Sequence, residues 1–301
     1  MNRKEFRLPV TVIIPVRNRP KLLRQALDSV FGTVWPSELL VVSNGTAEDR
    51  EADRKAFEHW QVHRQDLINA GNLVADPPEA HFLERSKPGP AGARNLGARK
   101  ANQPWLAFLD SDDLWKPEKL EMQWNFLKAR PHLKACHSRE DWKKDQRQLS
   151  VPLRLQPVTG APLEESLHVC LVSASSIMIQ RQTFLELGGF DERFPSCEDF
   201  EFWIRYFLQD SMGCIPHPLV IKRSGAWKQV SGEGLLDLQR LRALLLHTPS
   251  LCKRGLQQSL LESARRRGKI LGGLPDRWAR RAERLLRRIE FLAARHSPTD
   301  I

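Results

Sequence analysis

The sequence lacks any long uninterrupted apolar run. A membrane-spanning helix needs about 20 consecutive apolar residues, and no stretch of the 301 residues approaches that length. The first residues lead directly into a short strand-like run rather than into the apolar segment of a secretion signal. We therefore expect a protein that is neither exported nor inserted into a membrane, and that works in the cytoplasm.

Cysteine is scarce and shows no pairing pattern. The five cysteines, at positions 136, 170, 197, 214 and 252, are odd in number and widely spaced, and none forms a Cys-x-x-Cys pair. Such a set indicates neither a disulfide framework nor a zinc ribbon. A reducing compartment fits this composition. The sequence also has no internal repeat and no low-complexity segment.

Basic charge is abundant but unevenly placed. The chain is 41% hydrophobic, enough for a full core, and its formal net charge is +11. Between Lys253 and Arg295 there are thirteen Lys or Arg residues and four Asp or Glu residues. The excess of positive charge is therefore concentrated near the C-terminus.

The first hundred or so residues alternate strand-like and helical patterns. Such alternation predicts an α/β fold with a parallel sheet and helices on both faces. The expected strands are Val10–Ile14, Leu39–Val42, His81–Glu84 and Trp105–Leu109, and the expected helices are Lys21–Phe31, Glu48–Leu67 and Ala91–Ala101. Ligands of such sheets bind outside the carboxyl ends of the strands.

Three carboxylates stand together at the end of one expected strand. Asp110, Asp112 and Asp113 follow the apolar run Trp105–Leu109 directly. Crowded carboxylates raise each other's pKa unless a cation neutralises them, and hard oxygen donors suit Mg²⁺ or Mn²⁺. The simpler alternative is that the acidic residues end the strand and cap a helix at Leu114–Leu127, a role open to Asp113.

Three ordered segments carry a more specific signal. Residues 11–19 read TVIIPVRNR, residues 92–97 read GARNLG before AFLDSDDLW at 107–115, and residues 188–192 and 197–205 read GGFDE and CEDFEFWIR. Together they resemble the opening strand and the ARNxG, FLDxDDxW, GxFDE and EDxxxWxR segments of the family 2 glycosyltransferases. The resemblance runs from Val10 to about Arg205.

The resemblance implies a GT-A fold, a Rossmann-like and mostly parallel sheet flanked by helices, and an inverting sugar transfer from a nucleotide diphosphate donor. It implies a metal, Mg²⁺ or Mn²⁺, held by Asp112, with Asp110 in the metal shell or on the ribose. It assigns the catalytic base to Asp199, with Glu198 as the substitute. The expected nucleotide contacts also include Pro15, Arg17, Asn18 and Arg94.

Two positions depart from the family pattern. Ser43 and Asn44 stand where relatives usually have paired aspartates, so Asn44 is left to contact the base through its amide and UDP is in doubt as the donor nucleotide. Trp227 stands where some relatives have a histidine that reaches the metal, and Trp cannot coordinate a metal. Lys228 is a candidate to compensate as a point charge on the diphosphate, or else a solvated lysine.

The acceptor side is expected to begin at His137–Trp142. The stretch Ser138–His168 predicts an extended loop, followed by a strand at Ser175–Ile179 and a helix at Asp199–Leu208. Arg205, on that helix, is expected in a surface ion pair rather than in a substrate contact. The acceptor itself is expected to be a glycan or a lipid-linked sugar.

We expect a catalytic domain at 1–230, with a nucleotide-sugar half at about 8–115 and an acceptor half at about 116–230, and a basic helical extension at 231–301. Its expected helices lie at about 233–247, 255–271 and 276–295. The last carries one apolar stripe, Trp278, Leu285, Leu286, Ile289 and Leu292, among arginines.

Two interpretations of that last helix stay open. It either lies on an anionic membrane surface, which would make the protein peripheral on the inner membrane, or packs on the catalytic domain with a solvated basic face. Nucleic acid is not expected as a partner. For the whole chain, two alternatives to a transferase remain: a non-catalytic relative that binds a nucleotide sugar, and, with less support, an Asp-x-Asp phosphatase.

Overall fold

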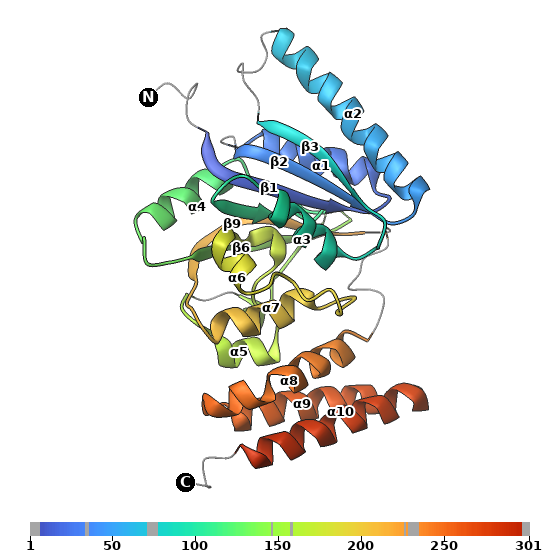
Figure 1. The fold of residues 1–301 in the computed structure, drawn as a ribbon, viewed down its shortest axis with the longest axis vertical. Helices are drawn as coiled ribbons and strands as arrows, with labels where there is room; N and C mark the ends of the chain where they lie inside the picture. Colours follow the sequence, from blue (N-terminus) through green and yellow to red (C-terminus); the bar gives the residue numbers. More distant parts are fainter. Residues whose placement is uncertain are drawn as a thin grey trace.

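The structure is a computed structural model that describes residues 7–33, 36–70, 78–145, 147–156, 159–225, 227 and 235–296. An α/β part with one mixed sheet is followed by helices near the C-terminus (Figure 1). These last helices, drawn in orange and red, lie at the end of the molecule opposite helix α2.

The first half of the sheet is parallel, as predicted. Its strands lie in the order β3-β2-β1-β4, and α1, α2 and α3 connect them. Their bounds are β1 Leu8–Val16, α1 Pro20–Phe31, β2 Pro36–Asn44, α2 Ala47–Asn69, β3 Glu79–Arg85, α3 Pro90–Lys100 and β4 Trp105–Phe108. Strands buried on both faces read as continuous apolar runs, and β1 is almost wholly buried.

The two faces of this half belong to different cores. Ile13, Leu40 and Val42 face helix α3 in one core, whereas Val12 and Val41 face α1 and α2 in the other. Because successive residues of a strand point to opposite faces, one strand supplies both cores. Because β1, β2 and β4 are parallel, their carboxyl ends lie at the same edge of the sheet.

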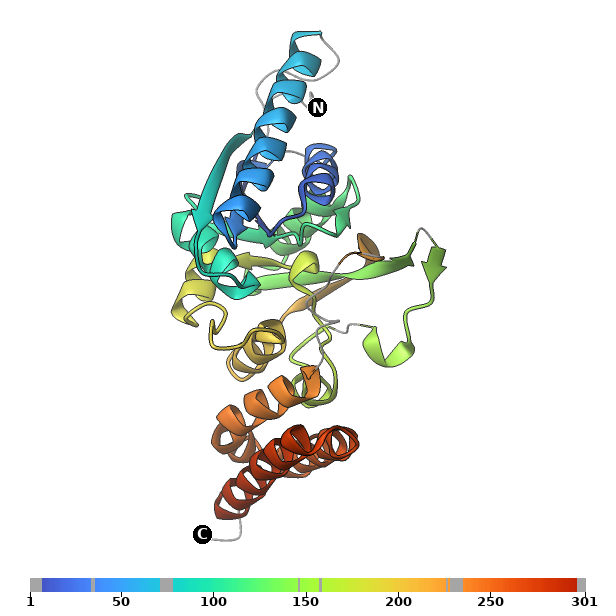
Figure 2. The same cartoon turned by 90° about the vertical axis from the view of Figure 1, so that its right-hand side faces the viewer.

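The second half of the sheet is mixed. It continues from β4 in the order β8-β6-β9-β5, with β6 and β9 parallel and β4–β8, β6–β8 and β5–β9 antiparallel. The bounds are β5 Leu114–Trp115, β6 Ala135–Lys144, β7 Arg147–Leu149, β8 Met178–Gln180 and β9 Gly213–Ser224. Strand β6 and its short partner β7 extend to one side of the molecule (Figure 2).

The predicted loop at 138–168 was wrong over its first part. Residues up to Lys144 belong to β6, which pairs with β9 along its length. The outer half of β6 is polar and only partly buried, so hydrophobic periodicity does not mark it. A 3-10 turn at Leu153–Leu155 (η1) and helix α5, Leu163–His168, follow.

Two neighbouring predictions also need correction. Asp113 does not cap a helix: Leu114 and Trp115 form β5, and helix α4 begins only at Lys119 and ends at Lys128. The strand expected from Ser175 begins instead with a 3-10 turn, Ala174–Ser176 (η2), and β8 follows it.

After β8, the described residues form the helices α6 Arg181–Glu186, α7 Glu198–Phe207, α8 Leu236–Lys253, α9 Gln257–Gly272 and α10 Asp276–Arg295. The last three pack on one another, and α8 and α9 also contact α7 and α5. The predicted apolar stripe of α10 faces this bundle, with Ile289 fully buried and Trp278, Leu285 and Leu286 packed against the same core. The expected domain boundary at 230 lies outside the described residues.

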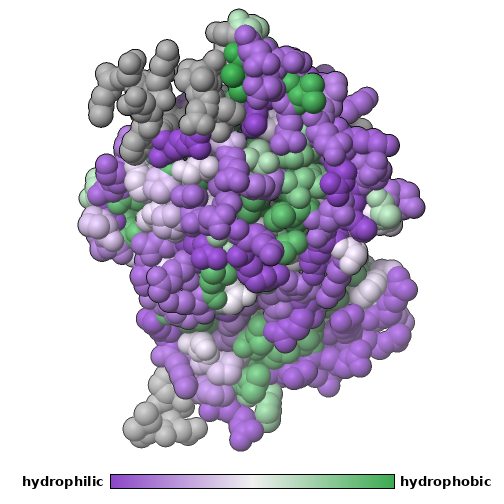
Figure 3. Space-filling view, turned by 45° about the horizontal axis from the view of Figure 1, so that its top comes forward, coloured by the Kyte–Doolittle hydropathy of each residue, from purple (hydrophilic) through white to green (hydrophobic). Residues whose placement is uncertain are grey.

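The surface is mostly polar. On the face shown in Figure 3, hydrophilic residues cover most of the surface and hydrophobic ones lie in patches between them. Among the described residues, no helix combines the length and the apolar character that crossing a membrane requires.

Candidate active site

Arg94 joins two carboxylates at the centre of the predicted site. It lies on α3, and its Nη2 is 2.5 Å from Asp110 Oδ1 while its Nη1 is 2.6 Å from Glu198 Oε1. Asp110 follows β4, and Glu198 begins α7. Three predicted residues from distant segments are thus brought into direct contact. The guanidinium also lies over the Phe190 ring, 5.4 Å from its centroid.

Burial and charge act in opposite directions on these carboxyls. Burial alone would raise the pKa of Asp110. The positive charges of Arg94, Lys222 and Arg19 have the larger effect, so the pKa of Asp110 lies below its ordinary value. Burial raises the pKa of Glu198 to about 7, although Arg94 opposes the rise. Asp110 is therefore ionised, whereas Glu198 changes its protonation state near pH 7.

Asp112 is covered by two donors. Its Oδ2 lies 3.0 Å from Arg19 Nη1 and accepts a hydrogen bond of 3.1 Å from Trp227 Nε1. Its backbone carbonyl accepts a hydrogen bond of 2.6 Å from Arg223 Nε. The residue that replaces the expected histidine therefore contacts the central carboxylate directly. Lys228, the other residue considered there, lies outside the described residues.

Asp113 supports the site rather than lining it. Its carboxylate accepts hydrogen bonds from Ser175 Oγ at 2.7 Å and from the Arg223 amide at 3.0 Å. Ser175 Oγ in turn accepts the Asp110 amide at 3.1 Å. Burial, and then the neighbouring carboxylates, raise the pKa of Asp113 to about 7 against the effect of Lys222. Ser175 thus fixes the acidic segment to the 3-10 turn that precedes β8.

Asp53 is a site residue that the sequence interpretation missed. Its buried carboxylate accepts the amides of Asn18 and Arg19, each at 3.0 Å, and the Ser43 hydroxyl at 2.8 Å. It fixes the loop after β1, where Asn18 has a φ of 49°, and so places Arg19 beside Asp112. The sequence signal that could have identified Asp53 is its place one helical turn before Phe57, on the buried face of α2.

The other predicted nucleotide contacts lie at the same edge. The Asn44 amide donates to the Val16 carbonyl and its Oδ1 accepts the Gly89 amide, both at 2.9 Å. Its side chain thus ties the ends of β1 and β2 to the start of α3, and the amide that was expected to contact a base already has these partners. Pro15 is buried within β1. Arg17 is largely exposed and lies 3.4 Å from Asp49.

Asp199 lies in the first turn of α7, beside Glu198. It is half-buried, and its Oδ1 accepts the Phe200 amide at 2.7 Å. In the part of the chain that the structure describes, Asp199 forms no ion pair, in contrast to Glu198. Of these two carboxylates, Glu198 is thus held by Arg94 and Asp199 is not.

A cavity of about 230 Å³ lies on the acceptor side. Its wall is formed largely by β6, η1 and β9; the lining residues include Arg139, Glu140, Trp142, Leu155 and Pro218. Glu140 accepts hydrogen bonds from the Ser173 hydroxyl and, at 3.0 Å, from Trp142 Nε1. These bonds fix the Trp142 ring as one wall.

The side chains of the site could supply only part of the ligands of a metal ion. Among the described residues, no group of three or more His, Cys, Asp or Glu side chains could hold a metal ion. Asp112 offers carboxylate oxygen, which is a hard donor, while Asp110 is paired with Arg94. Such a set fits Mg²⁺ or Mn²⁺ only if phosphate oxygens and water complete the shell.

Two protein-family models match the sequence. The model of the family described as glycosyl transferase family 2 matches residues 11–187, more than half of the chain, and one described as glycosyltransferase like family 2 matches residues 158–228. The chain therefore belongs to glycosyl transferase family 2.

Relatives by sequence match only in part. An uncharacterized glycosyltransferase of Rickettsia bellii is 27% identical over 211 residues, which are 70% of this chain and 28% of that protein. The putative teichuronic acid biosynthesis glycosyltransferase TuaG of Bacillus subtilis is 27% identical over 121 residues, 40% of this chain and 42% of that protein. The chain thus spans less than a third of the length of the Rickettsia relative.

Solved structures share the fold. Staphylococcus aureus TarS 1–349 in complex with UDP-GlcNAc has a TM-score of 0.64 at 15% identity, covering 95% of this chain and 91% of that one. The Pyrobaculum calidifontis mannosyltransferase PcManGT in complex with GDP-Man and Mn²⁺ has a TM-score of 0.55 at 16% identity, covering 99% and 89%. At these identities the likeness establishes the GT-A fold alone.

Proposed function

We propose that the chain transfers a sugar from a nucleoside diphosphate donor to an acceptor hydroxyl, with inversion at the anomeric carbon. The observation that carries the proposal is Arg94, whose guanidinium joins Asp110, at the end of β4, to Glu198, beside Asp199. A donor held at the strand ends and a base on α7 would then face the same sugar. Membership of the family and the GDP-Man and UDP-GlcNAc bound by structural neighbours support this proposal.

The donor side must stabilise the charge of the leaving diphosphate. Asp112 would hold the divalent metal, with Asp110 beside it on the ribose or in the metal shell, and Arg19 and Arg94 each form an ion pair with one of these carboxylates. A bound metal ion would act as a Lewis acid on the phosphate oxygens. The Mn²⁺ in the mannosyltransferase complex supports this cofactor class.

The acceptor side must remove one proton. As the acceptor oxygen bonds to the anomeric carbon, the bond to the diphosphate breaks and its electron pair leaves with the nucleotide. The hydroxyl proton passes to Asp199, which forms no ion pair in the described part of the chain. Glu198, which is buried against Arg94, is less available and is better suited to fixing the turn.

The cavity bordered by Trp142 would take the acceptor. An indole ring fixed by Glu140 offers an apolar face, on which the C–H face of a sugar packs. We propose a glycan or lipid-linked sugar as the acceptor and surface polysaccharide synthesis as the setting. The similarity to TuaG, named as a putative teichuronic acid biosynthesis glycosyltransferase, supports this class.

The basic face of α10 would contact an anionic membrane. Seven exposed arginines lie within an arc of about 120° and along about 27 Å of this helix, taking 3.6 residues and 5.4 Å per turn; they are Arg277, Arg280, Arg281, Arg284, Arg287, Arg288 and Arg295. Exposed Phe291 lies on the same arc. Because the apolar stripe packs inward, contact would depend mainly on charge. The enzyme would then work in the cytoplasm, peripheral on the inner membrane.

A non-catalytic nucleotide-sugar-binding protein is the second candidate. The observation that favours it is the coverage of Asp112 by Arg19 and Trp227, which a catalytic metal would have to share. A phosphatase with Asp110 as nucleophile has less support, because Arg94 already pairs with that carboxylate.

Thermal unfolding with a panel of UDP, GDP, dTDP and CMP sugars, each with and without Mn²⁺, tests the proposal. A ligand that binds only the native state raises its apparent stability. We expect one nucleotide class to raise the melting temperature in a metal-dependent way, and that donor to be consumed when acceptor glycans are added. If a donor bound but was not consumed with any acceptor, the non-catalytic candidate would be favoured. If no donor bound at all, both the transferase and the non-catalytic binding protein would be refuted.

A further inference from the structure

Helix α8 lies along the helix that carries the proposed base. Three contacts join them in sequence order: Cys197 Sγ to the Leu236 carbonyl at 3.7 Å, Glu201 Oε1 to His247 Nε2 at 2.8 Å, and Arg254 Nη2 to the Leu208 carbonyl at 2.5 Å. The family matches end at residue 228. Helix α8 is therefore a feature of this chain beyond the matched region.

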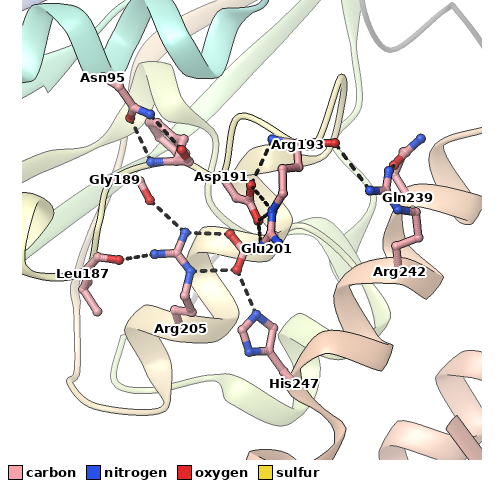
Figure 4. Close-up of polar contacts among 11 residues, drawn as sticks. Asn95, Leu187, Gly189, Asp191, Arg193, Glu201, Arg205, Gln239, Arg242 and His247 are labelled. Carbon is pink, nitrogen blue, oxygen red and sulfur yellow. Dashed lines mark hydrogen bonds and ion pairs between the residues drawn. The ribbon is translucent and has the colours of Figure 1, made fainter.

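Glu201 is the centre of this junction (Figure 4). Its side chain is 1% exposed and accepts hydrogen bonds from Arg205 Nε at 2.7 Å, Arg205 Nη2 at 2.6 Å and His247 Nε2 at 2.8 Å. Burial alone would raise the pKa of Glu201, but the bonds from His247 and Arg205 bring it below its ordinary value. A buried carboxylate that loses one of its donors carries a large free-energy penalty.

Arg205 extends the network towards α3. It forms the ion pair expected for it, but it is half-buried and also donates to the Leu187 carbonyl and, at 2.8 Å, to the Gly189 carbonyl. The next residue, Phe190, exchanges two hydrogen bonds with Asn95, at 2.9 and 2.8 Å. Gly189 has a φ of +67°, and a Cβ there would lie 2.5 Å from Asn95 Oδ1. The turn therefore has little freedom.

Asn95 is the neighbour of Arg94, which holds Asp110 and Glu198. The contacts run from His247 through Glu201 and Arg205 to the 187–190 turn and on to Asn95 of α3 (Figure 4). From α3, Arg94 contacts Glu198 at the start of α7 and so closes the network. Glu201 lies in the first turn of α7 with Glu198 and Asp199. A shift of Glu201 would therefore move both carboxylates.

The start of α7 also needs to be held. Cys197 has a φ of 61°, a left-handed conformation that costs a residue other than glycine on the order of 1 kcal/mol or more. Such a conformation persists only where the surroundings impose it. Two contacts with α8 provide such restraints: the Cys197 thiol contacts the Leu236 carbonyl, and the His247 ring contacts Glu201.

We propose that His247 is a positioning residue for sugar transfer: through Glu201 it holds the first turn of α7 so that Asp199 faces the acceptor hydroxyl. The inference rests on the proposed function. It makes the C-terminal helices part of the catalytic unit. It also assigns to His247 a role in turnover rather than in donor binding.

The test compares His247→Leu with His247→Gln, because a Gln amide can still donate to Glu201. Leu246→Ala is the matched control, since Leu246 is the adjacent residue on α8 and is 47% exposed. Misplacement of a catalytic group by about 1 Å costs on the order of a hundredfold in rate. We expect His247→Leu to lower kcat about tenfold to a hundredfold with an unchanged KM for the donor, and His247→Gln to recover most of the loss.

Hydrogen exchange of the amides at 198–201 gives a second measurement that does not need activity. Exchange should be faster in His247→Leu and normal in His247→Gln and Leu246→Ala. Wild-type kcat in the Leu variant, unchanged exchange there, or an equal loss of donor affinity and stability in both His247 variants would each overturn the proposal. A wild-type protein that neither binds nor turns over any donor would instead refute the proposed function, and the exchange data would still decide whether His247 holds the turn.

Discussion

Trp227 donates its indole N–H to the carboxylate of Asp112 over 3.1 Å. With Arg19 at 3.0 Å from the same oxygen, Oδ2 of Asp112 is neutralised by the protein itself. A divalent ion bound to this oxygen would compete with these two donors. The phosphates of the donor must then supply much of the ion's affinity, so metal binding and nucleotide binding should be strongly coupled.

The first prediction separates the roles of Asp112 and Asp199. Asp112→Asn should abolish the metal-dependent part of nucleotide binding, because Mg²⁺ and Mn²⁺ sites of this kind depend on one or two charged carboxylates, while Asn can still accept from Trp227. Asp199→Asn should leave donor binding intact and lower kcat at least a hundredfold, since general-base catalysis contributes about 10² to 10⁴-fold. Calorimetric titration of nucleotide with and without Mn²⁺, and single-turnover transfer, measure the two effects.

Each variant is the control for the other. Full turnover in Asp199→Asn would remove it as the base, and Glu198→Gln would then be the next variant to assay. Metal-dependent binding that survives in Asp112→Asn would remove the metal role from Asp112.

The second prediction concerns pH and Glu198. Burial raises its pKa from 4.5 to about 7, so the folded protein binds this proton more tightly than the unfolded chain does. The resulting stability is fully present below about pH 4.5 and is lost as the pH rises through about 7. At 1.36 kcal/mol per pKa unit the loss is on the order of 1 to 3 kcal/mol.

Urea denaturation at pH 5 and pH 8 measures this loss. Glu198→Gln should lack the contribution, so its free energy of unfolding should fall less than that of the wild type between these two pH values. Glu58→Gln, at an exposed position of α2, should follow the wild type. If the wild type instead gained stability over the Gln variant on going to pH 8, the attraction of Arg94 would outweigh burial and the pKa of Glu198 would be depressed.

Much of the donor half could be predicted from the sequence because its signals are local. Strands β1, β2 and β4 are continuous buried runs, and the residues Arg94, Asp110 and Glu198 stand in short ordered motifs. The carboxyl ends of neighbouring strands then bring such motifs to one edge. That geometry accounts for the contact of Arg94 with Asp110, whereas Glu198 reaches Arg94 from the start of α7.

The missed features depend on partners far along the chain. Strand β6 is polar in its outer half and exists because β9 pairs with it. Asp53 lies in a helix and gains its role only when the loop after β1 folds over it. Asn44 was expected to contact a base, but whether an amide contacts a ligand or a backbone carbonyl is decided by tertiary structure.

The third prediction concerns the basic face of α10. Deleting the helix would uncover buried Ile289 and its neighbours, so charge substitutions are the sharper test. Near an anionic surface each arginine contributes about 1 kcal/mol, and the triple variant R281Q/R284Q/R288Q should therefore bind phosphatidylglycerol-rich vesicles at least tenfold more weakly at low salt.

The matched control K55Q/K100Q/K128Q removes the same charge from exposed positions of the catalytic part. Because the interaction is screened within about 10 Å at 0.1 M ionic strength, added salt should weaken wild-type and control binding far more than triple-variant binding in vesicle co-sedimentation. Equal binding by the triple variant and the control, at every salt concentration, would show that the arginine face is solvated and makes no membrane contact.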